Sequence, residues 1–363
     1  MARIRKHYGK WQVLYRDPAT KRERSIGVFT RKGDATRMKR QLEYQLETGE
    51  WIDPALKQTR LDAWAAQWLA TRSHLKPKTI ETYESLLNAR VLPAFGEARL
   101  QDIRGIDVDT WVAQMSAYGL SASRIRQAYH VLNSILDSAV RNRMISSNPA
   151  HGVALPKKPV REMLFLTPTE VDDLAAAVDD RYETLVYTLA YCGLRAGEAT
   201  ALRRNRVNLL RAELVVAESA TEVHGHLVFG ETKNRRMRTV GVPPFLRHKL
   251  EGHMETYSTP DPSSLVFTSP DGGPLRLSNF RQREWKPAVR NAGLDPKLRV
   301  HDLRHTAVAM LISQGTYPKD VQEHLGHSSF AVTMDLYGHL YPMARERVAE
   351  TLEDVYRKRS GSP

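Results

Sequence analysis

"VHDLRHTAVAMLISQG" at residues 300–315, followed by "HLGHSSFAVTMDLYGH" at residues 324–339, concentrates the chemistry of this chain. A helix with 3.6 residues per turn that starts near His301 would place His301, Arg304 and His305 on one face. The other face would carry apolar residues, namely Leu303, Ala307, Met310 and Leu311. The pattern therefore predicts a buried helix with a cationic edge that can exchange protons.

The global composition limits what this edge can meet. The chain has 363 residues, 41% of them hydrophobic, which is enough for the cores of two or three domains. Its single cysteine, Cys192, cannot form an internal disulfide and is typical of a reducing compartment. No apolar run approaches the roughly 18 residues of a membrane span, and the charged start "MARIRKHYGKW" lacks an apolar signal segment. We expect a cytoplasmic protein with no membrane contact.

Positive charge indicates a polyanionic partner. The formal net charge is +13 and the pI is near 9.8, which favours nucleic acid over a membrane surface. Residues 1–50 alone contain 13 Lys and Arg against 6 Asp and Glu. A basic protein that only tolerates its charge is the alternative, and composition does not exclude it.

Residues 1–55 are expected to form a small sheet packed on one helix. Alternating residues around Val13 predict a strand, and the run around Ile26 predicts its return strand. A helix should follow, with Asp34 as its N-cap. The basic residues available here for DNA phosphates are Arg22, Arg24, Arg31 and Lys32. A solvated surface is the simpler role for any one of them, whereas DNA contact better explains the cluster.

Residues 58–152 are expected to form a bundle of four helices. Apolar residues recur at helical intervals in four segments, and Ser121 should cap the last of them. Basic residues at helix ends or on exposed faces are further candidates for DNA contact, although solubility alone would also explain them. These candidates are Lys76, Lys78, Arg124 and Arg126.

Residues 153–163 are rich in Pro and Lys and lack periodicity, which is typical of a linker. In residues 164–363, Thr167 and Glu170 have the spacing of a capping box, and helical patterns alternate with short strand-like runs. The expected fold class is multi-domain α+β. It comprises a small N-terminal sheet-plus-helix domain, a helical bundle, and a mostly helical α+β domain with a small antiparallel sheet.

Two other functions share parts of these patterns. "HDLRH" is similar to the zinc-protease motif H-E-x-x-H, but Asp302 replaces the Glu and Arg304 would place a cation beside the metal. We therefore expect no metal site. Two helices joined by a short turn in residues 303–326 would suit a helix-turn-helix regulator. A regulator of this kind would account for DNA binding but would give no role to Arg195 or Lys233.

Four motifs together resemble the active-site signature of the tyrosine recombinases, the phage integrase family. They are "CGLRAGEA", "HDLRHTAV", "LGHSS" and "TMDLYGH", in the order and spacing of that family. A lysine in "TKNRRMR" is a looser match. The matching residues are Arg195, Lys233, His301, Arg304, His327 and Tyr337.

The resemblance implies cleavage and rejoining of DNA through a covalent 3′-phosphotyrosyl intermediate, with no metal or cofactor. Arg195 and Arg304 would hold the non-bridging phosphate oxygens with bidentate cationic donors. His327 would also bind the scissile phosphate. Tyr337 would be the nucleophile, and Tyr341, one helical turn later, is its alternative.

The resemblance also implies roles in proton transfer. His301 would accept the proton of the phenol, and Lys233 would protonate the leaving 5′-oxygen. Glu198 would orient Arg195 or His301, and His305 would support the site from outside the reacting groups.

By the same resemblance the protein is an integrase that inserts and excises a phage or other mobile element. Its partners would be double-stranded DNA with core-type and arm-type attachment sites, and three further copies of the chain in a tetramer on DNA. A DNA-bending host factor and a directionality factor are further implied partners, in the nucleoid of a prokaryotic cytoplasm. The alternatives are a chromosome- or plasmid-resolving recombinase of the same chemistry and a catalytically silent DNA-binding regulator.

Overall fold

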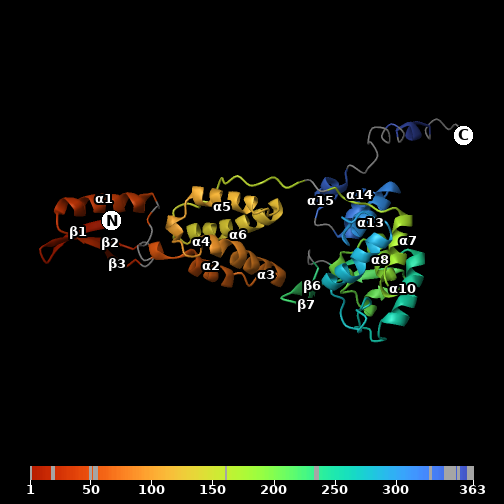
Figure 1. Cartoon of the computed structure of the whole chain (residues 1–363). Helices are drawn as coiled ribbons and strands as arrows, with labels where there is room; N and C mark the ends of the chain where they lie inside the picture. The colour runs from red at the N-terminus through yellow and green to blue at the C-terminus, as the bar shows by residue number, and fades with distance from the viewer. Residues whose placement is uncertain are drawn as a thin grey trace. The chain divides into compact units, whose positions relative to one another are not determined.

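The computed structural model describes residues 2–17, 21–48, 51, 56–159, 162–232, 237–326, 329–338, 349 and 352–357. The chain folds as two compact units, Met1–Val160 and Arg161–Pro363. Figure 1 draws both, and each is described by itself. None of the helices within these described ranges is long and apolar enough to cross a membrane.

The first unit begins with a three-stranded antiparallel sheet in the order β1 (Ala2–His7), β2 (Lys10–Arg16) and β3 (Glu23–Phe29). Helix α1 (Lys32–Glu47) packs on this sheet (Figure 1). Alternate residues of the strands point toward α1, and among them Val13 is fully buried in a small apolar core. The other face of the sheet carries Arg3, Arg5 and Gln12 together with Leu14 and Val28.

One local prediction for this segment is incomplete, and one is wrong. The sequence predicts two strands, and the structure adds β1. In β1 only Ile4 is a large apolar residue, so the alternation that marks a strand is weak. The N-cap of α1 is Arg31, without a side-chain hydrogen bond, and Asp34 lies in the first turn instead. There its charge still favours the helix, because the N-terminal end of a helix is partly positive.

The rest of the first unit is a helical bundle. Its helices are α2 (Leu61–Ala70), α3 (Pro77–Leu86), α4 (Leu92–Phe95), α5 (Gly105–Ala117) and α6 (Ala122–Arg141). A π-helical turn, Leu87–Val91, joins α3 to α4. Ser121 caps α6 as predicted, since its hydroxyl accepts a hydrogen bond from the backbone N–H of Arg124 at 3.3 Å. Leu132 and Ile135 of α6 are fully buried at the centre of the bundle.

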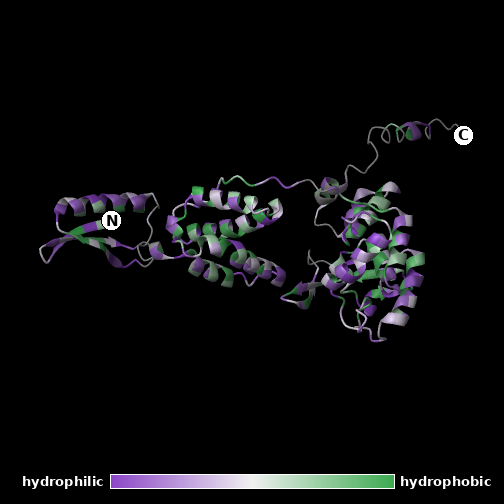
Figure 2. Cartoon of the chain, viewed as in Figure 1, coloured by the Kyte–Doolittle hydropathy of each residue, from purple (hydrophilic) through white to green (hydrophobic). Residues whose placement is uncertain are grey.

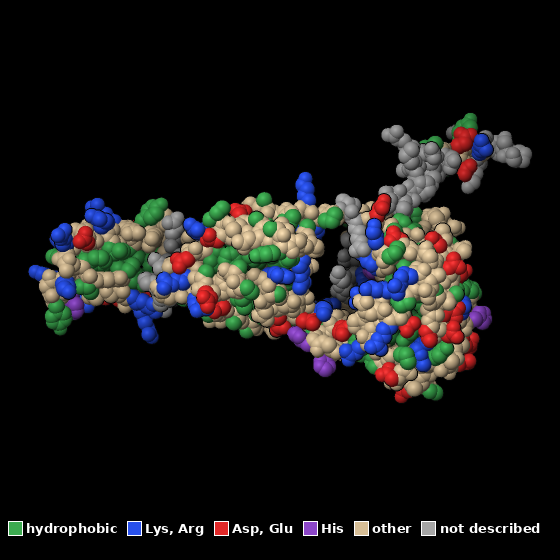
Figure 3. All heavy atoms as spheres, in the orientation of Figure 1, with side chains coloured by type: hydrophobic (Ala, Val, Ile, Leu, Met, Phe, Trp, Pro, Cys, Tyr) green, Lys and Arg blue, Asp and Glu red, His purple; other side chains and the backbone are tan. Residues whose placement is uncertain are grey.

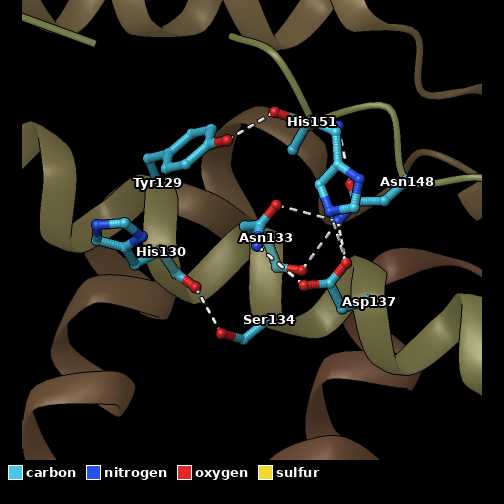
Figure 4. Close-up of polar contacts among 8 residues, drawn as sticks. Tyr129, His130, Asn133, Ser134, Asp137, Asn148 and His151 are labelled. Carbon is cyan, nitrogen blue, oxygen red and sulfur yellow. Dashed lines mark hydrogen bonds and ion pairs between the residues drawn. The ribbon is translucent and has the colours of Figure 1, made fainter. Parts of the chain in front are cut away.

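A polar network fastens the chain that follows α6 back onto that helix (Figure 4). The side-chain amide of Asn148 donates to Asn133 Oδ1 at 3.0 Å and to Asp137 Oδ1 at 2.7 Å. Asn133 in turn donates to Asp137 Oδ2 at 3.0 Å. The same carboxylate pairs with His151 Nε2 at 2.9 Å. Asp137 is therefore surrounded by two amides and one imidazole.

Two further side chains of α6 hold the segment after it. The Tyr129 hydroxyl donates to the backbone carbonyl of Ala150 at 2.6 Å (Figure 4). Arg126 donates through Nε to the carbonyl of Pro156 at 2.9 Å and through Nη2 to that of Leu155 at 3.4 Å. The first residues of the predicted linker are thus bound to the bundle.

The second unit is built around the buried helix α8 (Asp180–Cys192). Helices α7 (Pro168–Ala177), α10 (Pro244–Tyr257) and α13 (Asp302–Ser313) pack against it. Figure 2 shows apolar residues gathered in the middle of this unit, where α8 lies. The predicted capping box of Thr167 and Glu170 is present at the start of α7.

The remaining elements surround this helical core. Strands β4 (Val207–Asn208), β5 (Glu213–Val216) and β8 (Arg238–Gly241) form an antiparallel sheet, and β6 (Glu218–Val223) and β7 (His226–Glu231) form a hairpin. The other helices are α9 (Ala196–Ala199), α11 (Leu277–Phe280), α12 (Lys286–Asn291), α14 (Pro318–Leu325) and α15 (Phe330–Tyr337), with a π-helical turn, Arg281–Trp285, before α12. The predicted fold class is confirmed.

Candidate active site

Arg304 is the most deeply buried cation of the candidate site, with 2% of its surface exposed. Its guanidinium donates to the carbonyl of Gly193 at the end of α8 and to the carbonyl of Leu325 at the end of α14, the latter at 2.7 Å. Burial, followed by the positive charge of Arg195, lowers the pKa of Arg304 to about 9. Arg304 therefore remains charged at neutral pH.

The close fit around Arg304 depends on a glycine. Gly193 has φ +61° and ends α8 in the left-handed conformation. A Cβ atom at this position would lie 2.9 Å from Leu325 Cδ2, so another residue would have to shift that leucine side chain as well as adopt a strained backbone conformation. Because carbonyls at helix C-termini carry partial negative charge, Arg304 is attracted to both helix ends that it joins.

Glu198 connects two arginines beneath the surface. Its carboxylate accepts hydrogen bonds from the backbone N–H of Arg195 at 3.0 Å and from Arg195 Nη1 at 2.8 Å. Arg238 binds the same carboxylate through Nη1 at 3.1 Å and Nη2 at 2.6 Å. Burial alone would raise the pKa of Glu198, but the hydrogen bonds and charge of Arg238, with those of Arg195, outweigh it and lower the pKa to about 2. The predicted contact between Glu198 and Arg195 is present.

Tyr337 ends α15 with only 1% of its surface exposed. Its hydroxyl lies 2.6 Å from His305 Nδ1, and apolar residues of α13 and α14, including Val308 and Val321, enclose its ring. Burial, only partly offset by the charge of Arg304, raises the pKa of Tyr337 to about 12. At neutral pH the phenol is thus protonated and hydrogen-bonded to His305.

His301 stands at the N-cap position of α13 and is exposed. Its ring meets the ring of His305 edge to face, with centroids 4.9 Å apart. Although the residue as a whole is exposed, desolvation of its ring by the neighbouring protein and, after it, the charges of His305, Arg304 and Arg299 lower the pKa of His301 to about 4. At neutral pH His301 is therefore unprotonated and able to accept a proton.

The structure describes four of the six predicted catalytic residues. Lys233 and His327 lie outside the described residues, and so does Tyr341. Their predicted roles rest on the sequence motifs. The four that are described come from α13, α15 and the start of α9, and Arg304 links them electrostatically, since its charge acts on Tyr337 and His301.

In the N-terminal sheet, the basic residues predicted to contact DNA have partners of their own. Arg24 pairs with the buried Asp17 at 3.2 Å, and Lys32 lies over the ring of Trp11 at 5.3 Å. Arg22 and Arg31 are exposed. Figure 3 shows other Lys and Arg side chains spread over the visible surface, with acidic side chains between them.

In the helical bundle, the four predicted DNA contacts differ in how they are held. Lys76 is exposed at the N-cap of α3, and Lys78 pairs with Glu81 at 2.7 Å. Arg124 makes only long contacts of 3.5 Å. Arg126 uses its donors on the linker carbonyls described above, so a structural role competes with the predicted DNA contact.

Arg238 is a residue of this site that the sequence analysis did not assign. It lies among the arginines of "TKNRRMR", where composition distinguishes none of them. One signal was available, because strand alternation places Arg238 on the same side of β8 as the buried Val240.

Comparison with known proteins decides the family. Residues 164–343 match the Phage integrase family, and residues 51–116 match its N-terminal SAM-like domain. Together these two stretches span more than half of the chain. The chain belongs to the phage integrase family. It is a site-specific DNA recombinase of the tyrosine class, as the motifs predicted.

Similar proteins span nearly the whole chain. The integrase of Mycobacterium phage L5 is 28% identical over 363 residues, covering 96% of this chain and 95% of that protein. A Tn1549 transposon integrase in complex with circular intermediate DNA superposes with a TM-score of 0.70 at 18% identity, covering 81% of this chain and 99% of the other. A lambda integrase dimer bound to a COC′ core site gives a TM-score of 0.60 at 19% identity, covering 92% and 93%. These structures share the recombinase fold.

The zinc-like motif "HDLRH" has other partners in this recombinase. The Asp302 carboxylate accepts hydrogen bonds from the backbone N–H of Arg299 at 2.7 Å and from its Nε at 3.0 Å. His305 is bonded to Tyr337. In the part of the chain that the structure describes, no three His, Cys, Asp or Glu side chains are grouped as metal ligands.

Proposed function

We propose that this recombinase joins and separates specific DNA sites to insert and excise a phage or other mobile element, using Tyr337 as its nucleophile. The observation that carries this proposal is the hydrogen bond between the Tyr337 hydroxyl and His305, on the same helix as Arg304. It brings a protonated tyrosine, a histidine that holds its hydroxyl and a buried guanidinium together.

In the cleavage step, the Tyr337 oxygen attacks the scissile phosphorus and the 5′-oxygen leaves. A 3′-phosphotyrosyl bond replaces the phosphodiester, so the energy of the bond is kept for the later attack of a 5′-hydroxyl. Arg195 and Arg304 stabilise the negative charge that gathers on the non-bridging oxygens, and His327 adds a hydrogen bond to the phosphate.

The phenol proton must leave as the new bond forms. His301, unprotonated at neutral pH because of its low pKa, accepts that proton. His305 holds the hydroxyl beforehand, and Lys233 protonates the leaving 5′-oxygen. Each proton taken up is released again in the religation step, so the exchange needs no external energy source.

Burial of Tyr337 adds a condition to this mechanism. The Tyr337 hydroxyl, on a residue with 1% exposure, cannot meet a DNA phosphate directly in this conformation, and neither can Arg304, with 2% exposure. We infer that DNA engagement moves α15 and brings the tyrosine out of its apolar surroundings, at the cost of the contacts with Val308 and Val321.

The first unit supplies DNA contacts in this proposal. The open face of its sheet presents Arg5, Gln12 and Ser25 in a hydrogen-bonded row, with Arg5 Nε 2.9 Å from Gln12 Oε1 and Gln12 Nε2 2.9 Å from Ser25 Oγ. Side chains held in this way suit arm-type sites. Core-type sites then fall to the helical bundle, with Lys76 and Lys78 as phosphate contacts.

Assembly on DNA belongs to the same proposal. Four copies of the chain meet at two core sites in the cytoplasm of a prokaryotic host. In the described helical segment 352–357, Leu352, Val355 and Tyr356 are exposed and spaced for one helix face. This face suits packing onto a neighbouring copy. A DNA-bending host factor and a directionality factor would set the geometry and direction of the reaction.

A covalent-adduct assay tests the nucleophile. Purified protein is mixed with nicked attachment-site DNA in excess EDTA, and denaturing gels compare the wild type with Tyr337→Phe and, as the matched control, Tyr341→Phe. We expect an adduct with the wild type and with Tyr341→Phe, and at least a thousandfold less with Tyr337→Phe. An adduct that persists in Tyr337→Phe would contradict the assignment, and wild-type protein that binds the DNA without forming any adduct would favour a silent regulator.

A further inference from the structure

Arg238 is a nearly buried cation for which the proposed chemistry has no role. Its side chain is 10% exposed, and it stands at the start of β8 on the side of the fully buried Val240. A guanidinium withdrawn this far from water is costly unless its donors are satisfied. Two different parts of the unit satisfy them.

The first partner is the Glu198 carboxylate, which Arg238 binds with both terminal nitrogens at 3.1 and 2.6 Å. Such a bidentate pair fixes the plane of the carboxylate as well as its position. The second partner is the end of α14, where Arg238 Nε donates to the carbonyl of His324 at 3.0 Å. A Cβ atom at Gly326 would lie 2.8 Å from Arg238 Cδ, so the arginine stem packs directly against the backbone there.

Because of these contacts, the Arg195 side chain supplies only a minor share of the hydrogen bonds to the Glu198 carboxylate. Of the hydrogen bonds given by described side chains, Arg195 contributes one to this carboxylate, through Nη1, while Arg238 contributes two. Arg195 remains 24% exposed. Without Arg238, the buried charge of Glu198 would have Arg195 as its main partner and would draw that guanidinium inward.

Arg238 also steadies the second arginine. It holds the carbonyl of His324, and Arg304 holds the carbonyl of the next residue, Leu325. The two guanidiniums therefore donate hydrogen bonds to consecutive backbone carbonyls at the C-terminal end of α14. A shift of α14 caused by loss of Arg238 would disturb the contact of Arg304 as well.

We propose that Arg238 is a positioning residue for recombination: it fixes Glu198 and the end of α14, so that Arg195 and Arg304 are held ready for the scissile phosphate. This inference rests on the proposed function, which assigns both arginines to that phosphate. In this role Arg238 acts through Glu198 and the end of α14, the groups to which its donors are bound.

The first test separates DNA binding from chemistry. Arg238→Met and Arg238→Lys are compared with Lys249→Met, a control that removes a 2.6 Å ion pair with Glu183 elsewhere in the same unit. Gel shifts give the Kd for core-site DNA, and single-turnover adduct formation at saturating DNA gives the cleavage rate. We expect Arg238→Met to cleave about 100-fold more slowly with its Kd changed less than threefold, Arg238→Lys to be intermediate, and Lys249→Met to match the wild type.

The second test asks whether Arg238 acts through Glu198. In a Glu198→Gln background, Arg238→Met should slow cleavage further by about tenfold at most, because the link to Glu198 is already broken and only the contact with the His324 carbonyl of α14 is left to lose. A further loss of cleavage rate as large as the roughly 100-fold loss expected in the wild-type background would overturn the proposal. If Arg238→Met melts before the assay temperature, the same cycle with Arg238→Lys decides.

The third test distinguishes positioning from leaving-group protonation. A 5′-bridging phosphorothiolate substrate has a leaving group that needs no protonation. Arg238→Met should stay slow on it, and recovery to the wild-type rate would overturn the proposal. Wild-type protein that fails to form a Tyr337-dependent adduct would refute the proposed function, whereas a normal adduct rate in both Arg238 variants would refute only this inference.

Discussion

Each unit of the molecule contains a carboxylate held by several side chains, and the two networks differ in charge. In the first unit, Asp137 accepts from Asn133, Asn148 and His151 (Figure 4). In the second unit, Glu198 accepts from two arginines, and Arg304 lies close enough for their charges to lower its pKa. One network joins its carboxylate to two amides and an imidazole, whereas the other joins it to two permanently charged guanidiniums and carries a surplus of positive charge.

The difference indicates what each network is for. Amides and an imidazole satisfy Asp137 and hold two segments of chain together, which is a structural task. Three guanidiniums around one carboxylate repel one another, and such crowding persists where an anion is to be bound. A phosphate entering the second unit would relieve that repulsion, whereas an anion near Asp137 would gain nothing.

The largest expected effect comes from removing the charge of Glu198. Its pKa of about 2 lies below the ordinary 4.5, so its stabilisation is complete above about pH 4.5 and disappears as the pH falls toward 2. The shift corresponds to about 3 kcal/mol. Glu198→Gln should abolish this part of the acid dependence and slow cleavage about 100-fold.

Calorimetry between pH 5 and pH 3, together with the single-turnover assay at pH 7, measures both effects. The isosteric Asp137→Asn variant is the control, since it removes the carboxylate of the network in the first unit. An equal loss of cleavage rate in Glu198→Gln and Asp137→Asn would contradict the conclusion that only the network around Glu198 serves the chemistry.

An intermediate effect is expected from Asn148→Ala in the first unit. The amide donates to Asn133 and Asp137, and its loss removes this donor from Asn133 Oδ1 and leaves Asp137 Oδ1 with His151 alone. The free energy of unfolding should fall by about 1–3 kcal/mol. Urea denaturation followed by tryptophan fluorescence measures this change. A slower cleavage rate of Asn148→Ala at saturating DNA would show that the network around Asp137 also contributes to the chemistry.

The smallest effect is expected from His151→Gln. The imidazole is 66% exposed although it lies 2.9 Å from Asp137 Oδ1. Exposed pairs of this kind contribute below about 1 kcal/mol. The same denaturation experiment measures this change. A fall in the free energy of unfolding as large as that of Asn148→Ala would mean that the network depends on the exposed His151 as much as on Asn148.

The sequence predicts much of the fold because local signals are strong in most segments. The capping box at Thr167 and the cap at Ser121 have their predicted forms. Helix α13 also forms where it was predicted, but it is buried on all sides from Asp302 to Val308 and has no separate cationic edge and apolar face. The exception is β1, where Arg3 and Arg5 face solvent and leave little apolar alternation to detect.

The candidate site is predictable only in part. Motifs identify Arg195, Arg304 and Tyr337, because their chemistry repeats across the family. The hydrogen bond between Tyr337 and His305 joins residues 32 positions apart, and the bond between Arg238 and Glu198 spans 40. Such contacts depend on how α13, α15 and β8 pack together, which no local pattern encodes.

The grip of Arg126 on Leu155 and Pro156 has a consequence for dissecting the protein. A fragment that ends at residue 152 would lose both carbonyls and strand a half-buried guanidinium. Just beyond these hydrogen bonds, Lys157 is exposed and offers trypsin a cleavable bond, whereas the bond after Lys158 is protected by Pro159. A stable piece of the first unit therefore extends at least through Pro156.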